Sequence, residues 1–290
     1  MFLDMNSVIY NYADDNTLSY ISNDINDIKA KLQHDCTKSM DWFQANNMKA
    51  NADKYLLMFL SRQNSFVDTH LMFEDNKIQA MQSINILGVE VDNKLNFRTH
   101  IDNICKQAGK QINALKRIKC YMDRECKMIL YNSFVSSNFN YCPIVWMFTG
   151  KLNIDNLEKS NKRALRFVTN DNESTYESLC LREGLLNIQK RCIKAIAIQM
   201  YKIKSNTAPN YLIELFSERE MHYNVRNQNL FNLPSFNTMT YGKKSFTYYG
   251  AKLWNALPNE IKNSVSLSSF KNSLNQWLKS VENISQIDFL

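Results

Sequence analysis

Short β-type runs and one amphipathic helix share the first third of the chain. Two runs rich in aromatic and β-branched residues flank the polar residues 14–16 within segment 7–22, which predicts a tight hairpin. From Ile25 to Phe43, apolar residues recur at steps of three and four, which predicts a helix. Later apolar runs predict strands at 55–60, 70–73, 77–79 and 84–97, the last with Gly88 at a point of bending or close backbone approach. This order of elements predicts an α+β fold with an antiparallel layer over residues 1–97.

Helical periodicity dominates after residue 97. Apolar residues from Ile101 to Ile118 form a stripe with helical spacing. Further helices are expected at about 123–138, 152–169, 187–204 and 266–281. Residues 205–250 are rich in polar residues and show weak periodicity. We therefore expect three segments, namely an α+β segment (1–97), a helical segment (98–175) and a mostly helical segment (176–290).

The charge of the chain is divided unevenly along its length. The 290 residues carry a net charge of +7. Residues 1–97 contain 8 basic and 13 acidic residues, whereas residues 98–170 contain 13 basic and 5 acidic residues. A basic helical segment can follow a phosphate backbone, and nearby carboxylates can hold cations. The alternative is that these basic helix faces are only solvated.

Several common sites are missing from the sequence. Its 6 glycines form neither a G-x-G-x-x-G nor a G-x-x-x-x-G-K-[ST] loop, which argues against glycine-built nucleotide sites. The 7 cysteines include no C-x-x-C pair and the 4 histidines are scattered, so we expect reduced core thiols rather than a zinc site. No apolar run reaches the roughly 18 residues of a membrane span, and the N-terminus lacks a basic flank. We expect an intracellular protein that is not secreted and does not enter a membrane.

The segment 12–15 (YADD) at the tip of the predicted hairpin is the main candidate for chemistry. Its adjacent carboxylates, Asp14 and Asp15, repel one another unless a cation lies beside them. Hard oxygen ligands of this kind suit Mg²⁺ or Mn²⁺, and a pair of such ions about 4 Å apart supports phosphoryl transfer. The alternative is a solvated Asp-Asp turn that binds nothing.

Further motifs accompany the YADD segment in a fixed order. They are FLDM (2–5), DWF (41–43), NADK (51–54), LGVEVD (87–92), LNF (95–97), HI (100–101), YCPIVW (141–146), NKRALR (161–166), SF (245–246), GAKLWNALP (250–258) and SFK (269–271). In these residues and their order, the chain resembles the reverse transcriptases of non-LTR retrotransposons, of the jockey-like and chicken-repeat-like kind. The resemblance spans nearly the whole chain.

The resemblance implies a fold and a reaction. It implies part of a polymerase palm over residues 1–97, a thumb over 98–175 and a helical region over 176–290. The reaction would be RNA-directed DNA synthesis, a template-directed nucleotidyl transfer with two Mg²⁺ (or Mn²⁺) ions. Asp14 would be the main ligand of both ions, and Asp15 the weaker partner.

The resemblance also implies roles for residues around the metal site. Tyr12 would shape the site beside the primer end, and Leu87 and Gly88 would support the primer backbone. Lys54 would be a general acid toward the leaving pyrophosphate, since a positioned amine can donate a proton there. The alternative for Lys54 is an exposed lysine that precedes a strand.

Two sets of basic residues are expected to contact nucleic-acid phosphates without reading sequence. They are Lys106, Lys110, Lys116, Arg117 and Lys119 in the first helix after residue 97, and Lys159, Lys162, Arg163 and Arg166 in a later one. The implied partners are an RNA template, a DNA primer and, in the complete enzyme, a dNTP. The implied location is a nuclear or cytoplasmic ribonucleoprotein.

The family places a third palm aspartate and the dNTP-binding fingers before the hairpin, where this chain has eleven residues ahead of Tyr12. We therefore expect a truncated reverse transcriptase without primer-extension activity of its own. One alternative is a non-catalytic RNA- or DNA-binding remnant that uses the basic helical region. Another is an inert fragment without a selected role.

Overall fold

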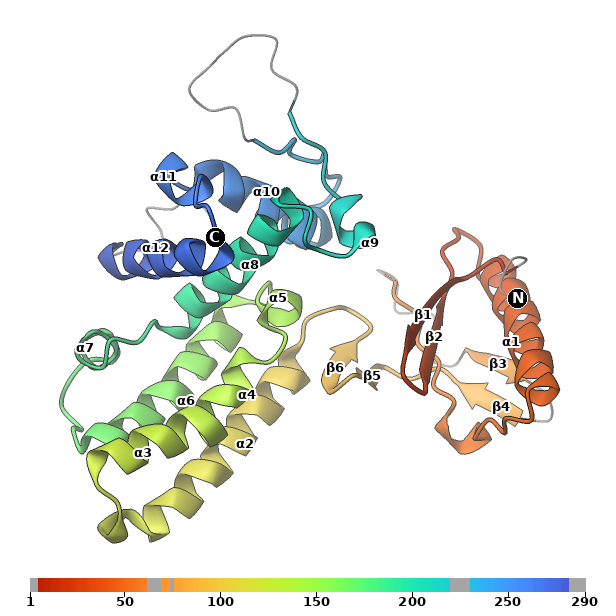
Figure 1. The fold of residues 1–290 in the computed structure, drawn as a ribbon. Coiled ribbons are helices and arrows are strands. Elements are labelled where there is room, and N and C mark those ends of the chain that lie inside the picture. The colour runs from red at the N-terminus through yellow and green to blue at the C-terminus, as the bar shows by residue number, and fades with distance from the viewer. Residues whose placement is uncertain (1–4, 62–68, 74–75, 220–229, 282–290) are drawn as a thin grey trace. The chain divides into compact units, whose positions relative to one another are not determined.

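The chain folds into two units, Met1–Leu95 and Asn96–Leu290, each of which has its own core (Figure 1). The computed structural model describes residues 5–61, 69–73, 76–219 and 230–281. Residues 2–4 of the FLDM motif therefore lie outside the described residues. The observed mixture of helices and small antiparallel hairpins is an α+β fold, as the sequence predicts.

Three hairpins and one long helix make up the first unit. Its elements are β1 (Val8–Tyr12), β2 (Asp15–Ser19), α1 (Ile25–Ala45), β3 (His70–Phe73), β4 (Asn76–Gln79), β5 (Ser83–Ile86) and β6 (Val89–Asp92), with a 3₁₀ turn at Ala52–Lys54. The strands pair as β1–β2, β3–β4 and β5–β6, each pair antiparallel and separate from the others in the described part of this unit. The predicted hairpin, helix and short strands at 70–73 and 77–79 are confirmed.

The apolar stripe of α1 builds the core of this unit. Asp24 caps the helix, because its Oδ1 accepts a hydrogen bond from the Asn26 amide at 2.9 Å. The core residues belong to α1, to the segment before β3, and to β3 and β4. They are Leu57, Phe59 and Leu71, with Ile25, Ile28, Leu32, Ile78 and Ala80 packed against them. The helix therefore covers the β3–β4 hairpin.

Two of the predicted strands are wrong. Residues 55–60, all of them described, form no strand but make a single bridge between Leu57 and Ala80. Leu57 and Phe59 of this segment are buried and pack with residues of α1, so burial there needs no sheet. The predicted strand 84–97 is the hairpin β5–β6, because Leu87 (φ 49°) and Gly88 (φ 81°) both adopt the left-handed conformation that reverses the chain.

Helices make up the second unit. They are α2 (Arg98–Arg117), α3 (Arg124–Leu130), α4 (Ser137–Asn140), α5 (Pro143–Trp146), α6 (Lys151–Thr169), α7 (Tyr176–Arg182), α8 (Ile188–Lys204), α9 (Asn210–Ile213), α10 (Phe246–Ala256), α11 (Asn259–Lys262) and α12 (Leu267–Ser280), with 3₁₀ and π-helical turns at Lys119–Tyr121 and Met239–Lys243. The long predicted helices are confirmed, but the one at 123–138 contains a π-helical stretch, Tyr131–Ser136. Helix α10 was not predicted from the sequence, because it begins inside the weakly periodic region 205–250.

Close packing of long helices forms the core of this unit. Helix α2 runs along α6, and α8 packs against α10 and α12 (Figure 1). Ile112 of α2 and Leu165 of α6 are fully buried, and Trp146 and Trp254 are core residues with exposed fractions of 0% and 1%. No helix among the described residues is long and apolar enough to cross a membrane.

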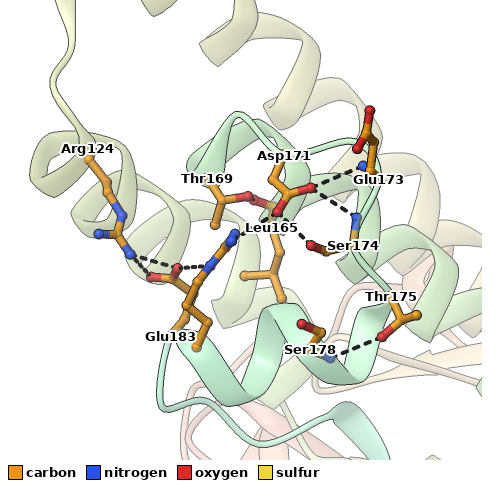
Figure 2. A network of polar contacts seen from close by, with 10 residues as sticks. Arg124, Leu165, Thr169, Asp171, Glu173, Ser174, Thr175, Ser178 and Glu183 are labelled. Carbon is orange, nitrogen blue, oxygen red and sulfur yellow. Dashed lines mark hydrogen bonds and ion pairs between the residues drawn. The ribbon is translucent and has the colours of Figure 1, made fainter.

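A polar network fixes the turn that follows α6 (Figure 2). The carboxylate of Asp171 accepts hydrogen bonds from the Glu173 and Ser174 amides, each at 3.0 Å, and from Arg182 at 2.9 Å. Hydrogen bonds from Ser174 and these other donors lower the pKa of Asp171 well below its ordinary value, although desolvation opposes them. Glu183 binds Arg124 at 2.7 Å, which ties α7 to α3.

A second polar network lies inside the helical unit. The Tyr131 hydroxyl, in the π-helical stretch, donates to Asn161 Oδ1 at 2.7 Å, and Asn161 Nδ2 donates to the Tyr176 hydroxyl at 2.7 Å. Arg191 Nη2 donates to the Tyr131 hydroxyl at 3.0 Å. Asn161 has an exposed fraction of 0%, so a replacement would leave both tyrosine hydroxyls without this partner in the core.

Replacing Asn161 by leucine is expected to lower the free energy of unfolding of the helical unit by about 1–3 kcal/mol, the usual cost of leaving buried polar groups unsatisfied. Urea unfolding of the 290-residue chain measures this change. Asn156→Leu is the matched control, because Asn156 is exposed on the same helix. Equal effects of the two replacements would show that the buried network does not stabilise the unit.

Candidate functional site

The YADD segment forms the tip of the β1–β2 hairpin. Tyr12 pairs with Asp15, so the turn consists of Ala13 and Asp14, and Asp15 belongs to β2. The turn thus starts one residue earlier than the sequence predicted. Ala13 has a φ of 52°, a left-handed conformation that costs an L-residue roughly 1–2 kcal/mol. The strained residue, Ala13, directly precedes the two carboxylates, Asp14 and Asp15.

The side chains at the tip face solvent. Tyr12 is 67% exposed, and Asp14 and Asp15 are also exposed. Within the described part of the chain, neither carboxylate accepts a hydrogen bond or forms an ion pair. Asn16 Nδ2 donates to the Asp14 main-chain oxygen at 3.3 Å. Both carboxylates are therefore available to an external cation.

This donor set fits Mg²⁺ or Mn²⁺. Proteins hold Mg²⁺ through one or two carboxylates, and water and substrate phosphates complete the shell. Asp14 and Asp15 supply two such carboxylates at neighbouring positions. The described residues contain no group of three His, Cys, Asp or Glu side chains arranged to hold a metal. The hairpin can thus contribute part of a metal shell.

A buried carboxylate on α1 positions the base of the hairpin. Asp35 is 0% exposed. Its Oδ2 accepts the Ser7 amide at 2.7 Å, and its Oδ1 accepts the Asn6 amide at 3.2 Å and Asn6 Nδ2 at 3.0 Å. His34 Nδ1 lies 3.0 Å from the same Oδ1. Asn6 and Ser7 directly precede β1, so these hydrogen bonds to Asp35 hold the start of the hairpin against α1.

These donors keep Asp35 ionised. Desolvation by burial is the largest single influence and raises the pKa of this carboxyl. Hydrogen bonds from Ser7, His34 and Asn6 together outweigh it and lower the pKa far below its ordinary value of 3.8. Folding therefore favours the charged form of Asp35. Sequence reasoning missed this residue, although its place beside the apolar stripe of α1 is a weak signal.

Other predicted residues of the catalytic site lie on separate elements of the same unit. Lys54 ends the 3₁₀ turn and is exposed. Lys54, Asp14 and Asp15 all belong to the described residues, and no ion pair joins the lysine to either carboxylate. Leu87 and Gly88 form the β5–β6 turn, where the Gly88 amide donates to Asn85 Oδ1 at 2.9 Å. The structure thus presents these residues on two exposed turns, and among the described residues no side-chain hydrogen bond or ion pair joins them to the carboxylates of Asp14 and Asp15.

The predicted basic residues of α2 lie on its solvent face. Lys106, Lys110 and Arg117 are exposed, and their spacing of four and seven residues places them in one line with Asn113. The buried stripe of α2 lies on the opposite side, at Ile101, Ile104, Ala108, Ile112 and Leu115. Lys116 and Lys119 are also exposed, beside this line and just after the helix.

The basic residues of α6 adjoin that line. Lys159 and Arg163 are exposed, and Lys162 and Arg166 are half-buried, on the side opposite the apolar stripe of α6. Arg163 Nη2 donates to Asn113 Oδ1 at 2.8 Å, which joins the basic face of α6 to that of α2. The structure therefore brings the two predicted sets together into one surface, which we call the α2–α6 basic surface.

One comparison with known proteins finds similarity to a transposon polymerase. The chain is 26% identical to a probable RNA-directed DNA polymerase from transposon BS of Drosophila melanogaster over 171 residues. The match covers 56% of this chain and 18% of the relative, so the chain spans less than a fifth of that protein's length. This match supports a distant relationship to reverse transcriptases.

Two further comparisons give no match. The sequence matches no family model. No solved structure resembles the chain closely enough to count as a match. The relationship to transposon polymerases therefore rests on sequence similarity, together with the motifs of the chain.

Replacing Asp35 by asparagine is expected to destabilise the first unit by about 1.5–3 kcal/mol at neutral pH, since hydrogen bonds to a charged acceptor are lost. Because folding lowers the pKa of Asp35, its contribution is complete above its ordinary value of 3.8 and is lost as the pH falls below that value. Asp35→Asn should remove this part of the acid dependence. Urea unfolding followed by NMR resonances of α1, at several pH values, measures both effects.

Asp41→Asn provides the matched control, because Asp41 is exposed on the same helix. It should change the unfolding free energy by less than about 0.5 kcal/mol. A variant at Asp35 that unfolds with the same pH dependence as the wild type would contradict the role assigned to this carboxylate.

Proposed function

We propose that this chain is part of a non-LTR retrotransposon reverse transcriptase of the jockey-like or chicken-repeat-like kind. The observation that carries the proposal is the exposed pair Asp14 and Asp15 at the tip of the β1–β2 hairpin, in a chain similar to a transposon RNA-directed DNA polymerase. The hairpin is then motif C of the palm, residues 1–97 are part of the palm, and residues 98–175 are the thumb.

In this proposal, Asp14 and Asp15 hold Mg²⁺ or Mn²⁺, with Asp14 as the main ligand. A bound pair of such ions would activate the primer hydroxyl and stabilise the leaving oxygen during nucleotidyl transfer. Both carboxylates point into solvent and carry no protein partner within the described residues, which supports their availability. Their place at a turn next to strained Ala13 supports a functional rather than a packing role.

Three other elements contribute to the proposed site. Tyr12, 67% exposed beside the carboxylates, lies against the primer end. The left-handed turn at Leu87 and Gly88 supports the primer backbone, where the absence of a Gly88 side chain permits close approach. Lys54, exposed at the end of the 3₁₀ turn, donates a proton to the leaving pyrophosphate.

Complete polymerisation is proposed for a larger assembly than these 290 residues. The chain matches 18% of the length of its relative, so DNA synthesis, dNTP binding and residence in a ribonucleoprotein are proposals for the whole protein. The two carboxylates of the hairpin would act there with a third from elsewhere. The 290 residues by themselves are expected not to extend a primer, and extension that Asp14→Ala abolishes would refute this.

Mn²⁺ is expected to bind at the hairpin tip and to broaden the amide resonances of residues 12–16 in an NMR titration. Asp14→Asn should weaken this binding by about tenfold or more, since even changes to residues that merely support a metal ligand cost that much. Asp41→Asn, which removes an exposed carboxylate elsewhere in the unit, should leave the broadening unchanged. Uniform broadening at all acidic surface residues would refute a specific site.

We also propose that the α2–α6 basic surface binds the phosphates of the primer–template. Lysines and arginines on it are exposed or half-buried, and Arg163 and Asn113 join its two halves. The N–H groups of these lysines and arginines can donate to phosphate oxygens. Contacts of this kind bind without reading sequence. This surface also carries the alternative function, a non-catalytic RNA- or DNA-binding protein.

Lys106→Gln with Lys110→Gln should reduce the salt dependence of binding to a fluorescent 20-base-pair DNA duplex. The slope of log K against log salt is negative, and each lost phosphate contact reduces its magnitude by about 0.9. The magnitude should therefore fall by about 2. Lys49→Gln with Lys77→Gln removes the same charge from exposed positions of the first unit and should leave the slope unchanged. Fluorescence anisotropy at several salt concentrations measures the slopes. Equal changes of slope in the two double variants would show that the effect comes from the net charge of the protein and not from the α2–α6 basic surface.

Retention of duplex binding in Asp14→Ala would favour the binding function without catalysis, because the hairpin would then be dispensable for it. Loss of binding in that variant would instead place the nucleic acid at the hairpin.

A further inference from the structure

Helices α8 and α12 pack together and carry basic residues without any acidic ones. Neither Ile188–Lys204 nor Leu267–Ser280 contains an aspartate or a glutamate. Two of the basic residues are engaged elsewhere, because Arg191 bonds to Tyr131 in the core and Lys204 pairs with Glu218 at 2.6 Å. The other basic residues meet no acidic residue of these two helices, so they can form a surface of one charge.

Four lysines gather where the two helices meet. Lys190 and Lys194 are one turn apart on α8, and Lys271 and Lys279 are two turns apart on α12, which places each pair in a line. Lys194 Nζ donates to Asn275 Oδ1 at 2.9 Å, and Asn275 lies midway between Lys271 and Lys279. This bond brings the two lines side by side.

The ammonium groups of this cluster are held together against their repulsion. Lys190 Nζ donates to the Val281 main-chain oxygen at 2.6 Å, and both Lys190 and Lys194 are half-buried. Desolvation lowers the pKa of Lys194, and the charges of Lys271 and Lys279 lower it further. Lys271 and Lys279 themselves are exposed, so they can reach a ligand in solution.

We infer that Lys190, Lys194, Lys271 and Lys279 form a second phosphate-binding surface, which contacts the backbone of nucleic acid at the α8–α12 junction. The positive charges of these lysines repel one another. An anion that binds between them would offset this repulsion. The cluster contains lysines alone, which bind phosphate as point charges and lack the fork by which arginine reads guanine. It therefore binds phosphates without selecting a sequence.

The choice of nucleic acid as the polyanion rests on the proposed function. The basic cluster itself is given by the structure and is independent of that function. An RNA or DNA strand carries phosphates at a regular spacing that can pair with two lines of lysines. The cluster lies on α8 and α12, so it is made of residues different from those of the α2–α6 basic surface. The α8–α12 surface gives the C-terminal region a role that the resemblance does not specify.

The test uses the full 290-residue chain, the same fluorescent 20-base-pair duplex and salt titrations by fluorescence anisotropy. Lys271→Gln with Lys279→Gln should lower the slope of log K against log salt by about 2, one contact for each lysine. Lys271→Arg with Lys279→Arg keeps both charges and should retain the wild-type slope. Lys49→Gln with Lys77→Gln again controls for net charge.

An unchanged slope in the double glutamine variant, with its helical circular dichroism intact, would overturn the inference. Should that variant unfold, the single replacements Lys271→Gln and Lys279→Gln decide, each with an expected fall of about 0.9. A loss of slope in the α2 variant alone would leave the proposed function standing and refute the α8–α12 surface. A wild-type chain that does not bind the duplex would refute both.

Discussion

The ionised, fully buried carboxylate of Asp35 is the interaction on which the arrangement of the candidate site depends. It accepts hydrogen bonds from the chain just before β1 and from its own helix, so it connects the hairpin to α1. A buried charge is costly unless several donors surround it, and here Asn6, Ser7 and His34 supply them. With its base fixed in this way, the hairpin can leave its tip exposed. The two carboxylates of the tip then face solvent, where the proposed function places a cation.

The helical unit uses charge in a different manner. Its apolar stripes face inward along α2, α6 and α8, and its basic side chains remain outside. Hydrogen bonds through asparagines assemble these side chains into surfaces, Arg163 with Asn113 on one side and Lys194 with Asn275 on the other. Such bonds align cationic groups without neutralising them. A protein that handles a polyanion benefits from this arrangement, because the positive field remains available to phosphates.

Elements with regular apolar spacing could be predicted from the sequence, and those governed by distant partners could not. The stripes of α1, α2 and α6 specify these helices locally. A bend at Gly88 could be predicted, but its sharpness could not, because Leu87 also adopts a left-handed conformation that residue preferences do not mark. The role of Asp35 was missed because its donors Asn6 and Ser7 lie 29 and 28 residues away. Likewise, the two basic helix faces were predicted one at a time, and only the structure shows that they adjoin.

A titration of the Asp35 side-chain carboxyl by ¹³C NMR tests the account most directly. We predict that this resonance keeps its ionised chemical shift as the pH is lowered well below 3.8, the ordinary pKa of an aspartate, for as long as the unit stays folded. A midpoint at or above 3.8 would contradict it. Asp35 would then not be the charged anchor of the hairpin.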